Sequence, residues 1–193
     1  MLEVHQMPKP QGGNHKAPLL VSQEQKAIIN LRGNPQDPTF VQAVQQALGL
    51  PLPVAACSSI ANAHYRVVWV GPDDWFVIGA GGEQRSLEQR LRTALSGQHF
   101  SVTDVSSGYF VVTLAGAQAR DVLAQGCPLD LHASVFQPGH SAGTVFFRVG
   151  IYLWQRDNAP TFEMLVRRSF IDHFWQLINH CTLDCGWFAK QAA

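Results

Sequence analysis

The sequence contains no long apolar run and no excess of charge of either sign. No segment reaches the roughly 18 consecutive apolar residues that a membrane-spanning helix needs, so we expect no membrane partner. The 14 Lys and Arg residues balance the 14 Asp and Glu residues. Because nucleic-acid binding needs a clustered basic surface, this balance argues against a nucleic-acid partner. Residues 11–16 are polar and rich in glycine rather than part of a signal segment, which favours a cytoplasmic location.

Cysteine is also scarce, and the common catalytic motifs are missing. The chain has four cysteines, and it lacks the Cys-x-x-Cys pair that is typical of structural zinc sites. It also lacks the phosphate-binding loop, the Gly-x-Ser-x-Gly elbow and the His-Glu-x-x-His helix. From the residues we therefore predict that this chain contributes no catalytic residue, cofactor-binding residue or metal ligand.

The composition is that of a folded protein with a sizeable core. Hydrophobic residues make up 46% of the chain and charged residues 15%, which excludes a mainly disordered chain. Short alternating strands are interspersed with helical stretches. Residues 27–31 form a β-branched segment that ends near Gly33, and Asp37 followed by Pro38 is typical of a helix start. This alternation predicts an α+β fold.

The two halves of the chain resemble each other. Residues 28–33 align with residues 111–116, and each is an alternating strand that a glycine closes. The helix that follows ends in the phrase Ala-x-Gly-x-Pro-Leu in both halves, at Gly49 and at Gly126, where we expect glycine to supply a left-handed helix cap. Chance similarity between two α+β halves is the alternative to duplication. We favour a unit of strand, helix, strand, strand and helix that occurs twice.

The repeat predicts the architecture and the domain bounds. We expect two duplicated split βαβ, ferredoxin-like units that pack together, with antiparallel or mixed sheets and helices on the outer faces. Residues 26–105 would form the first repeat and residues 106–181 the second. A flexible N-terminal tail would cover residues 1–25, in which the apolar residues 19–21 could dock, and a C-terminal extension would cover residues 182–193.

Three polar residues are candidates for a partner interface. Asp104 precedes two serines at a predicted strand end, where it could act as an acid or base or simply close a turn. Arg167 and Arg168 follow another predicted strand. Since neighbouring side chains of a strand point to opposite faces, at most one of these arginines would join a shared site. The alternative is that both are solvated.

Five motifs, in order along the chain, resemble the gamma subunit of heterotetrameric sarcosine oxidase. They are residues 29–34, 69–75, 103–106, 126–131 and 159–170. The resemblance implies a subunit of an oxidase that demethylates sarcosine to glycine and produces hydrogen peroxide. When tetrahydrofolate is the co-substrate, the one-carbon unit leaves as methylenetetrahydrofolate.

The same resemblance implies where the cofactors and partners are. The complex would carry FAD, FMN, NAD and zinc in its other subunits, and none of them in this chain. The partners would be the alpha subunit above all, together with the beta and delta subunits. This chain would therefore be a non-catalytic subunit that contributes contacts.

A more distant similarity is to the fold of the folate-binding aminomethyltransferases, such as the glycine-cleavage T-protein. Those proteins carry a Thr-Gly-Glu-Asp-Gly-Phe-Glu phrase whose first glutamate binds the pterin. When Phe162 and Glu163 are aligned with its last two residues, Ala159 occupies the position of that glutamate. Alanine cannot make the paired hydrogen bonds of a carboxylate. A stand-alone folate-binding protein is nevertheless the alternative function, and an adaptor unrelated to sarcosine is a third.

Overall fold

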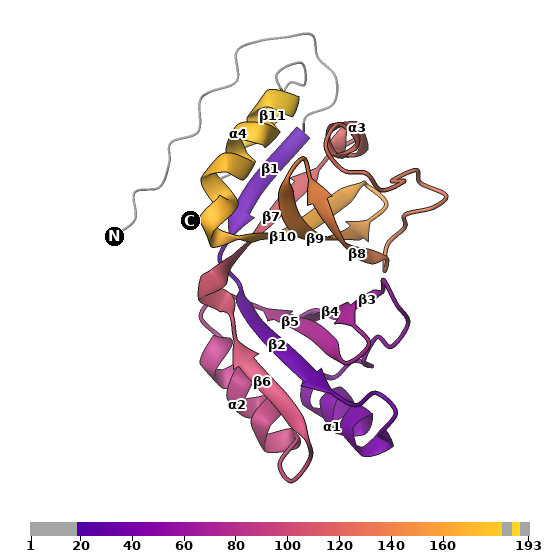
Figure 1. Ribbon diagram of the computed structural model, residues 1–193, viewed down its shortest axis with the longest axis vertical. Coiled ribbons are helices and arrows are strands. Elements are labelled where there is room, and N and C mark those ends of the chain that lie inside the picture. The colour runs from indigo at the N-terminus through magenta and orange to yellow at the C-terminus, as the bar shows by residue number, and fades with distance from the viewer. Residues whose placement is uncertain (1–18, 183–186, 190–193) are drawn as a thin grey trace.

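The computed structural model describes residues 19–182 and 187–189, which form two β-sheets with helices on their outer sides (Figure 1). The sheets face each other across the middle of the molecule, and each sheet is covered on its far side by two helices. The predicted α+β class is confirmed, and so is the packing of two split βαβ-like units with outer helices. Within the described residues, no helix combines the length and apolarity needed to cross a membrane.

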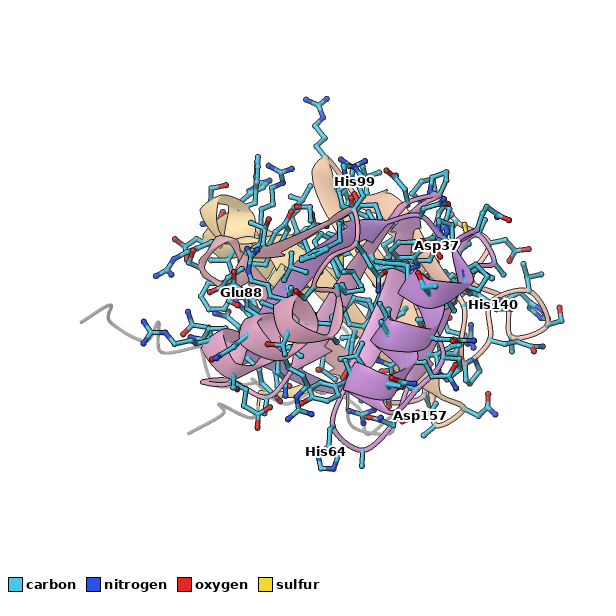
Figure 2. All side chains as sticks on the ribbon, turned by 90° about the horizontal axis from the view of Figure 1, so that it is seen from below. Asp37, His64, Glu88, His99, His140 and Asp157 are labelled. Atoms are coloured by element: carbon cyan, nitrogen blue, oxygen red, sulfur yellow. The ribbon has the colours of Figure 1, made fainter. Side chains whose placement is uncertain are left out.

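The first sheet has the strand order β3-β4-β5-β2-β6, and all of its neighbouring strands are antiparallel. Helices α1 and α2 lie side by side on its outer face, and Figure 2 views them from outside, with Asp37 before α1 and Glu88 on α2. The elements are β2 (Ala27–Gly33), α1 (Pro38–Leu48), β3 (Ser59–Ala61), β4 (Arg66–Gly71), β5 (Asp74–Gly79), α2 (Gln84–Ala94) and β6 (Phe100–Asp104).

Helix α1 begins and ends as the sequence predicts. The side chain of Asp37 accepts a hydrogen bond from the amide of Thr39 at 2.9 Å, and Pro38 occupies the first helical position. Both features satisfy or remove backbone donors that a helix start leaves unpaired. At the other end Gly49 adopts a left-handed conformation with φ of +69°, which glycine reaches without a steric penalty.

The second sheet has the order β11-β1-β7-β10-β9-β8 and is mixed, because β1 pairs with β11 in parallel and the other pairs are antiparallel. Helices α3 and α4 cover its outer face (Figure 1). The elements are β7 (Tyr109–Ala115), α3 (Ala119–Ala124), β8 (Ser141–Phe146), β9 (Val149–Asp157), β10 (Thr161–Arg167), α4 (Ile171–Cys181), β1 (Leu19–Glu24) and β11 (Trp187–Ala189).

Strand β1 corrects the expected N-terminal tail. The tail was predicted to reach residue 25, but residues 19–24 form a strand that pairs with β7, from Leu20 opposite Ala115 to Glu24 opposite Val111. Strand β1 takes the place beside β7 that β6 takes beside β2 in the first sheet. Residues 1–18, 183–186 and 190–193 lie outside the described part of the chain. The division at residue 105 remains a prediction.

Three groups of buried side chains hold the layers together. One lies between the first sheet and its helices and includes Leu31, Phe40 and Trp75. Another lies between the second sheet and its helices. The third lies between the two sheets, and we call it the inter-sheet layer: Ile28, Val68, Phe76, Ile78, Val111, Trp154 and Leu165. Strands buried on both faces explain why residues 27–31 are an almost unbroken apolar run.

Gly126 does not have the left-handed conformation that the sequence phrase predicts. Among the described residues with positive φ, Gly49 is present and Gly126 is absent. A Cβ atom at Gly126 would lie 2.5 Å from Cδ2 of Phe147, and its carbonyl accepts a hydrogen bond from the Phe147 amide at 2.7 Å. Glycine is therefore needed here for close approach of a neighbouring ring rather than for its backbone freedom.

We expect Gly33→Ala to destabilise the protein. A Cβ atom at Gly33 would lie 2.2 Å from Cε2 of Phe40, whose ring is buried against Trp75. Overpacking of this kind costs about 1–3 kcal/mol of unfolding free energy, which chemical denaturation would measure. Gly150→Ala is the matched control, because a Cβ atom there meets no atom within 4 Å. Equal stability of the two variants would contradict the prediction.

Candidate functional site

The three candidate interface residues lie close to the point where the chain passes from the first sheet to the second. Asp104 ends β6, and the short helix η1 (Ser106–Gly108) follows it into β7. Arg167 ends β10, and Arg168 begins a second short helix, η2 (Arg168–Phe170). The helices η1 and η2 contact each other. We call the surface formed by Asp104, Arg167, Arg168 and Phe170 the crossover surface, at the waist of the molecule in Figure 1.

Asp104 closes the turn that carries the chain from one sheet to the other. Its Oδ1 accepts hydrogen bonds from both the amide and the hydroxyl of Ser106, the former at 2.9 Å. The Ser106 hydroxyl oxygen in turn accepts a hydrogen bond from the amide of Ile28 at 2.9 Å. This is the Asx-type turn that aspartate and serine favour. A partner contact through Asp104 stays a prediction.

The two arginines differ in their surroundings. Arg167 is exposed, while the guanidinium of Arg168 lies 5.6 Å from the ring centre of Phe110. Neither arginine forms an ion pair with any residue in the part of the chain that the structure describes. The Phe170 residue beside them is 45% exposed. An exposed aromatic next to unpaired arginines has the composition of a protein-binding surface.

Sequence reasoning missed a polar cluster at the inter-sheet layer. Arg66 of β4 approaches Glu163 of β10 with 3.6 Å between Nε and Oε2, and it is the one ion pair among the described residues that joins the two sheets. The Glu163 carboxylate also accepts a hydrogen bond from Nε1 of Trp154 at 2.7 Å and one from Arg156 at 3.4 Å. Burial lowers the pKa of the Arg66 guanidinium, and the charge of Glu163 partly offsets that shift.

A weak signal in the sequence could have indicated this cluster. In β10 the apolar Phe162, Met164 and Val166 belong to the core under the helices. The alternate positions therefore face the other sheet, and Leu165 lies there, as expected for a buried face. Glu163 is a half-buried charged residue on that face, which means that its charge needs a partner. The identity of the partner, Arg66, depends on how the sheets pack.

Ala159 lies in the tight turn between β9 and β10. Its side chain cannot replace the pterin-binding carboxylate of the folate-binding proteins. Its amide donates a hydrogen bond to Oδ1 of Asp157 at 3.0 Å, and Asp157 lies on the molecular periphery in Figure 2. Burial acts to raise the pKa of Asp157, but hydrogen bonds from Ala159, Thr161 and Arg156 outweigh it and lower that pKa. The aspartate thus stabilises the turn as a carboxylate.

No clustered set of metal-binding side chains is found in the described ranges, where three or more His, Cys, Asp or Glu residues never come together. Cys181 ends α4, and Cys185, four residues further along the chain, lies outside the described residues.

Comparison with known families decides the assignment. The family described as "Sarcosine oxidase, gamma subunit family" matches residues 32–184. The chain belongs to the sarcosine oxidase gamma subunit family. The match spans both sheets and includes Arg167 and Arg168, and it confirms the resemblance inferred from the sequence motifs. A comparison with curated proteins finds no significant match.

Solved structures agree with membership of the gamma subunit family. A chain of the heterotetrameric sarcosine oxidase from Corynebacterium sp. U-96, in complex with pyrrole 2-carboxylate, is 25% identical with a TM-score of 0.80, and the alignment covers 95% of this chain and 91% of that chain. The glycine cleavage system aminomethyltransferase T from Bartonella henselae is 12% identical with a TM-score of 0.67. That alignment covers 92% of this chain and 48% of the aminomethyltransferase, and it shows a shared fold alone.

Proposed function

We propose that this chain is a non-catalytic assembly subunit of a heterotetrameric sarcosine oxidase, bound to alpha, beta and delta subunits. The complex would demethylate sarcosine oxidatively to glycine, transfer the one-carbon unit to tetrahydrofolate and produce hydrogen peroxide. FAD, FMN, NAD and zinc would be bound by the other subunits. The cytoplasmic location expected from the sequence is part of this proposal.

The observation that carries the non-catalytic role is the filled inter-sheet layer. A folate-binding relative would need a pocket between the two repeats and a carboxylate in place of Ala159. Instead, Phe76, Trp154 and Leu165 are buried between the sheets. The Glu163 carboxylate is already engaged by Arg66, Arg156 and Trp154. These contacts support a structural role for that region.

Docking would involve the crossover surface. A chain with no net charge gains little from long-range attraction, so its affinity depends on a few local contacts. Exposed Phe170 with Arg167 and Arg168 provides an aromatic and two cations, the residue types that dominate binding energy in protein interfaces. Asp104 would hold the backbone of this surface in place through its turn.

The proposed function is tested by expressing the four subunits together with an affinity tag on this chain. We expect the tag to recover a flavin-containing complex with sarcosine oxidase activity. Expression without this chain should lower the yield of the assembled oxidase. Full recovery of an active flavoprotein that lacks this chain would contradict an assembly role.

We expect Arg168→Glu to weaken the affinity of this chain for the remaining subunits by about 10-fold, the effect of losing one significant interface contact. Arg85→Glu is the matched control, since Arg85 is exposed on α2, which covers the outer face of the first sheet. Biolayer interferometry on the purified proteins would measure both. Equal affinities of the two variants would exclude the crossover surface as the docking surface.

The folate-binding alternative has its own test. Isothermal titration calorimetry of the isolated chain with tetrahydrofolate should give no binding heat. Micromolar affinity would favour the folate-binding function over a purely structural one.

A further inference from the structure

The hairpin between β8 and β9 ends in an unusual pair of residues, Phe147 and Arg148. Phe146 pairs with Val149, so the loop has two residues. The first, Phe147, has a φ of +52°. Two-residue hairpin loops with a positive φ at the first position prefer glycine there. A bulky side chain in this conformation is strained, and such strain is concentrated at functional sites.

The ring of Phe147 is held in place on one side and open on the other. It contacts Gly126, where even a Cβ atom would lie 2.5 Å from the ring, and the Phe147 amide donates to the Gly126 carbonyl at 2.7 Å. The ring of Phe146 meets it edge-on with 5.0 Å between centroids. Even so, Phe147 remains 40% exposed. The aromatic is therefore presented to the surroundings in one fixed position.

The corresponding hairpin of the first sheet shows that the fold does not require this arrangement. The turn between β3 and β4 is closed by Asn62, whose Oδ1 accepts hydrogen bonds from the amides of His64 at 2.9 Å and Tyr65 at 2.8 Å. Neither His64 nor Tyr65 has a positive φ. A polar turn with local hydrogen bonds satisfies the same connection, so closing this hairpin does not require an aromatic residue with a positive φ.

We propose that Phe147 and Arg148 are a docking anchor that inserts into an apolar pocket with an acidic rim on another subunit of the oxidase. Arg148 is exposed and has no ion-pair partner in the described part of the chain. An unpaired cation beside a fixed aromatic matches a pocket that combines apolar walls with a carboxylate. Val145, exposed two residues earlier, widens the apolar contact.

The position of the anchor fits the same partner that would cover the crossover surface. Helix α4 starts directly after Phe170, and at its other end Gln125, next to Gly126, donates a hydrogen bond to the carbonyl of Cys181 at 3.1 Å. One partner lying along α4 can therefore contact both regions. The inference rests on the proposed function, because it takes the occupant to be a subunit of the complex.

The test measures the affinity of the purified chain for the complex of the other subunits. Phe147→Asn removes the ring and keeps a residue that tolerates positive φ, and Arg148→Glu reverses an exposed charge without disturbing the fold. We expect each to weaken binding at least 10-fold, with a loss for Arg148→Glu that shrinks at high salt. The matched controls are Val54→Asn, an aliphatic residue that is 60% exposed in the first half, and Arg85→Glu.

The outcomes separate this inference from the proposed function. Binding by the wild-type chain, with weaker binding by both anchor variants and unchanged binding by both controls, would support the anchor. Wild-type affinity for Arg148→Glu and Phe147→Asn would overturn it and leave the assembly role intact. Failure of the wild-type chain to bind any subunit would overturn both. Thermal melting of each variant confirms that a loss of affinity is not a loss of folding.

Discussion

Replacing Val21 by aspartate is expected to unfold the second sheet. Val21 lies in the N-terminal strand β1, is fully buried and belongs to the core beneath α3 and α4. A carboxylate there would have no partner, and an uncompensated buried charge costs about 3–5 kcal/mol. Since domains of this size are stable by only about 5–15 kcal/mol, the strand should detach and leave β7 with an open edge.

Hydrogen exchange would locate the effect. The amides of β7 that face β1, near Val112 and Leu114, should lose protection, whereas those of β2 and β5 in the first sheet should keep more of theirs. Ser22→Asp is the matched control, because Ser22 is the next residue of the same strand, half-buried and on the opposite face. If Val21→Asp and Ser22→Asp unfold at the same denaturant concentration, β1 is not an integral part of the sheet.

The second large effect is expected at the ion pair between the sheets. Glu163→Gln keeps the shape of the side chain and an oxygen for the Trp154 indole, but leaves Arg66 without its countercharge. Breaking a fully buried pair costs about 3–5 kcal/mol, and since the two side chains are 15% and 16% exposed we expect about 2 kcal/mol of unfolding free energy.

A double-mutant cycle tests the assignment to this pair. Arg66→Met in the Glu163→Gln background should recover part of the stability, because no unpaired charge then remains between the sheets. Asp73→Asn is the control at the exposed pair Arg32–Asp73, whose side chains are 51% and 54% exposed, and it should change stability by less than about 1 kcal/mol. Independent, additive effects of the two substitutions would show that Arg66 and Glu163 do not interact.

Much of the fold follows from local features of the sequence. The first helix is predictable because Asp37, Pro38 and Gly49 act on backbone groups within a few residues. The two-unit architecture is predictable because strand alternation and glycine positions repeat. The place of β1 is not, since the short apolar segment at residues 19–21 carries no information about a pairing with β7 some ninety residues away.

In the candidate site, too, local features are predictable from the sequence and long-range contacts are not. The turn formed by Asp104 and Ser106 is local, and the sequence indicates it. The contact of η1 with η2, which brings Asp104 and the arginines to one surface, requires the packing of two sheets. Gly126 is instructive: the sequence phrase correctly marks glycine at a helix end, but the ring of Phe147 that requires it lies on a distant hairpin.

The connections between the two halves have a mechanical consequence. At the waist the chain passes between the sheets twice, from β1 to β2 and from β6 through η1 to β7. At the opposite edge, the backbones of Ser59 and Gly139 and of Ser141 and Cys57 are hydrogen-bonded at 2.7 and 2.8 Å. Because the two halves are joined along both margins, we expect them to resist hinge opening. We therefore expect a partner bound to the first half and a partner bound to the second half to be held at a fixed distance from each other.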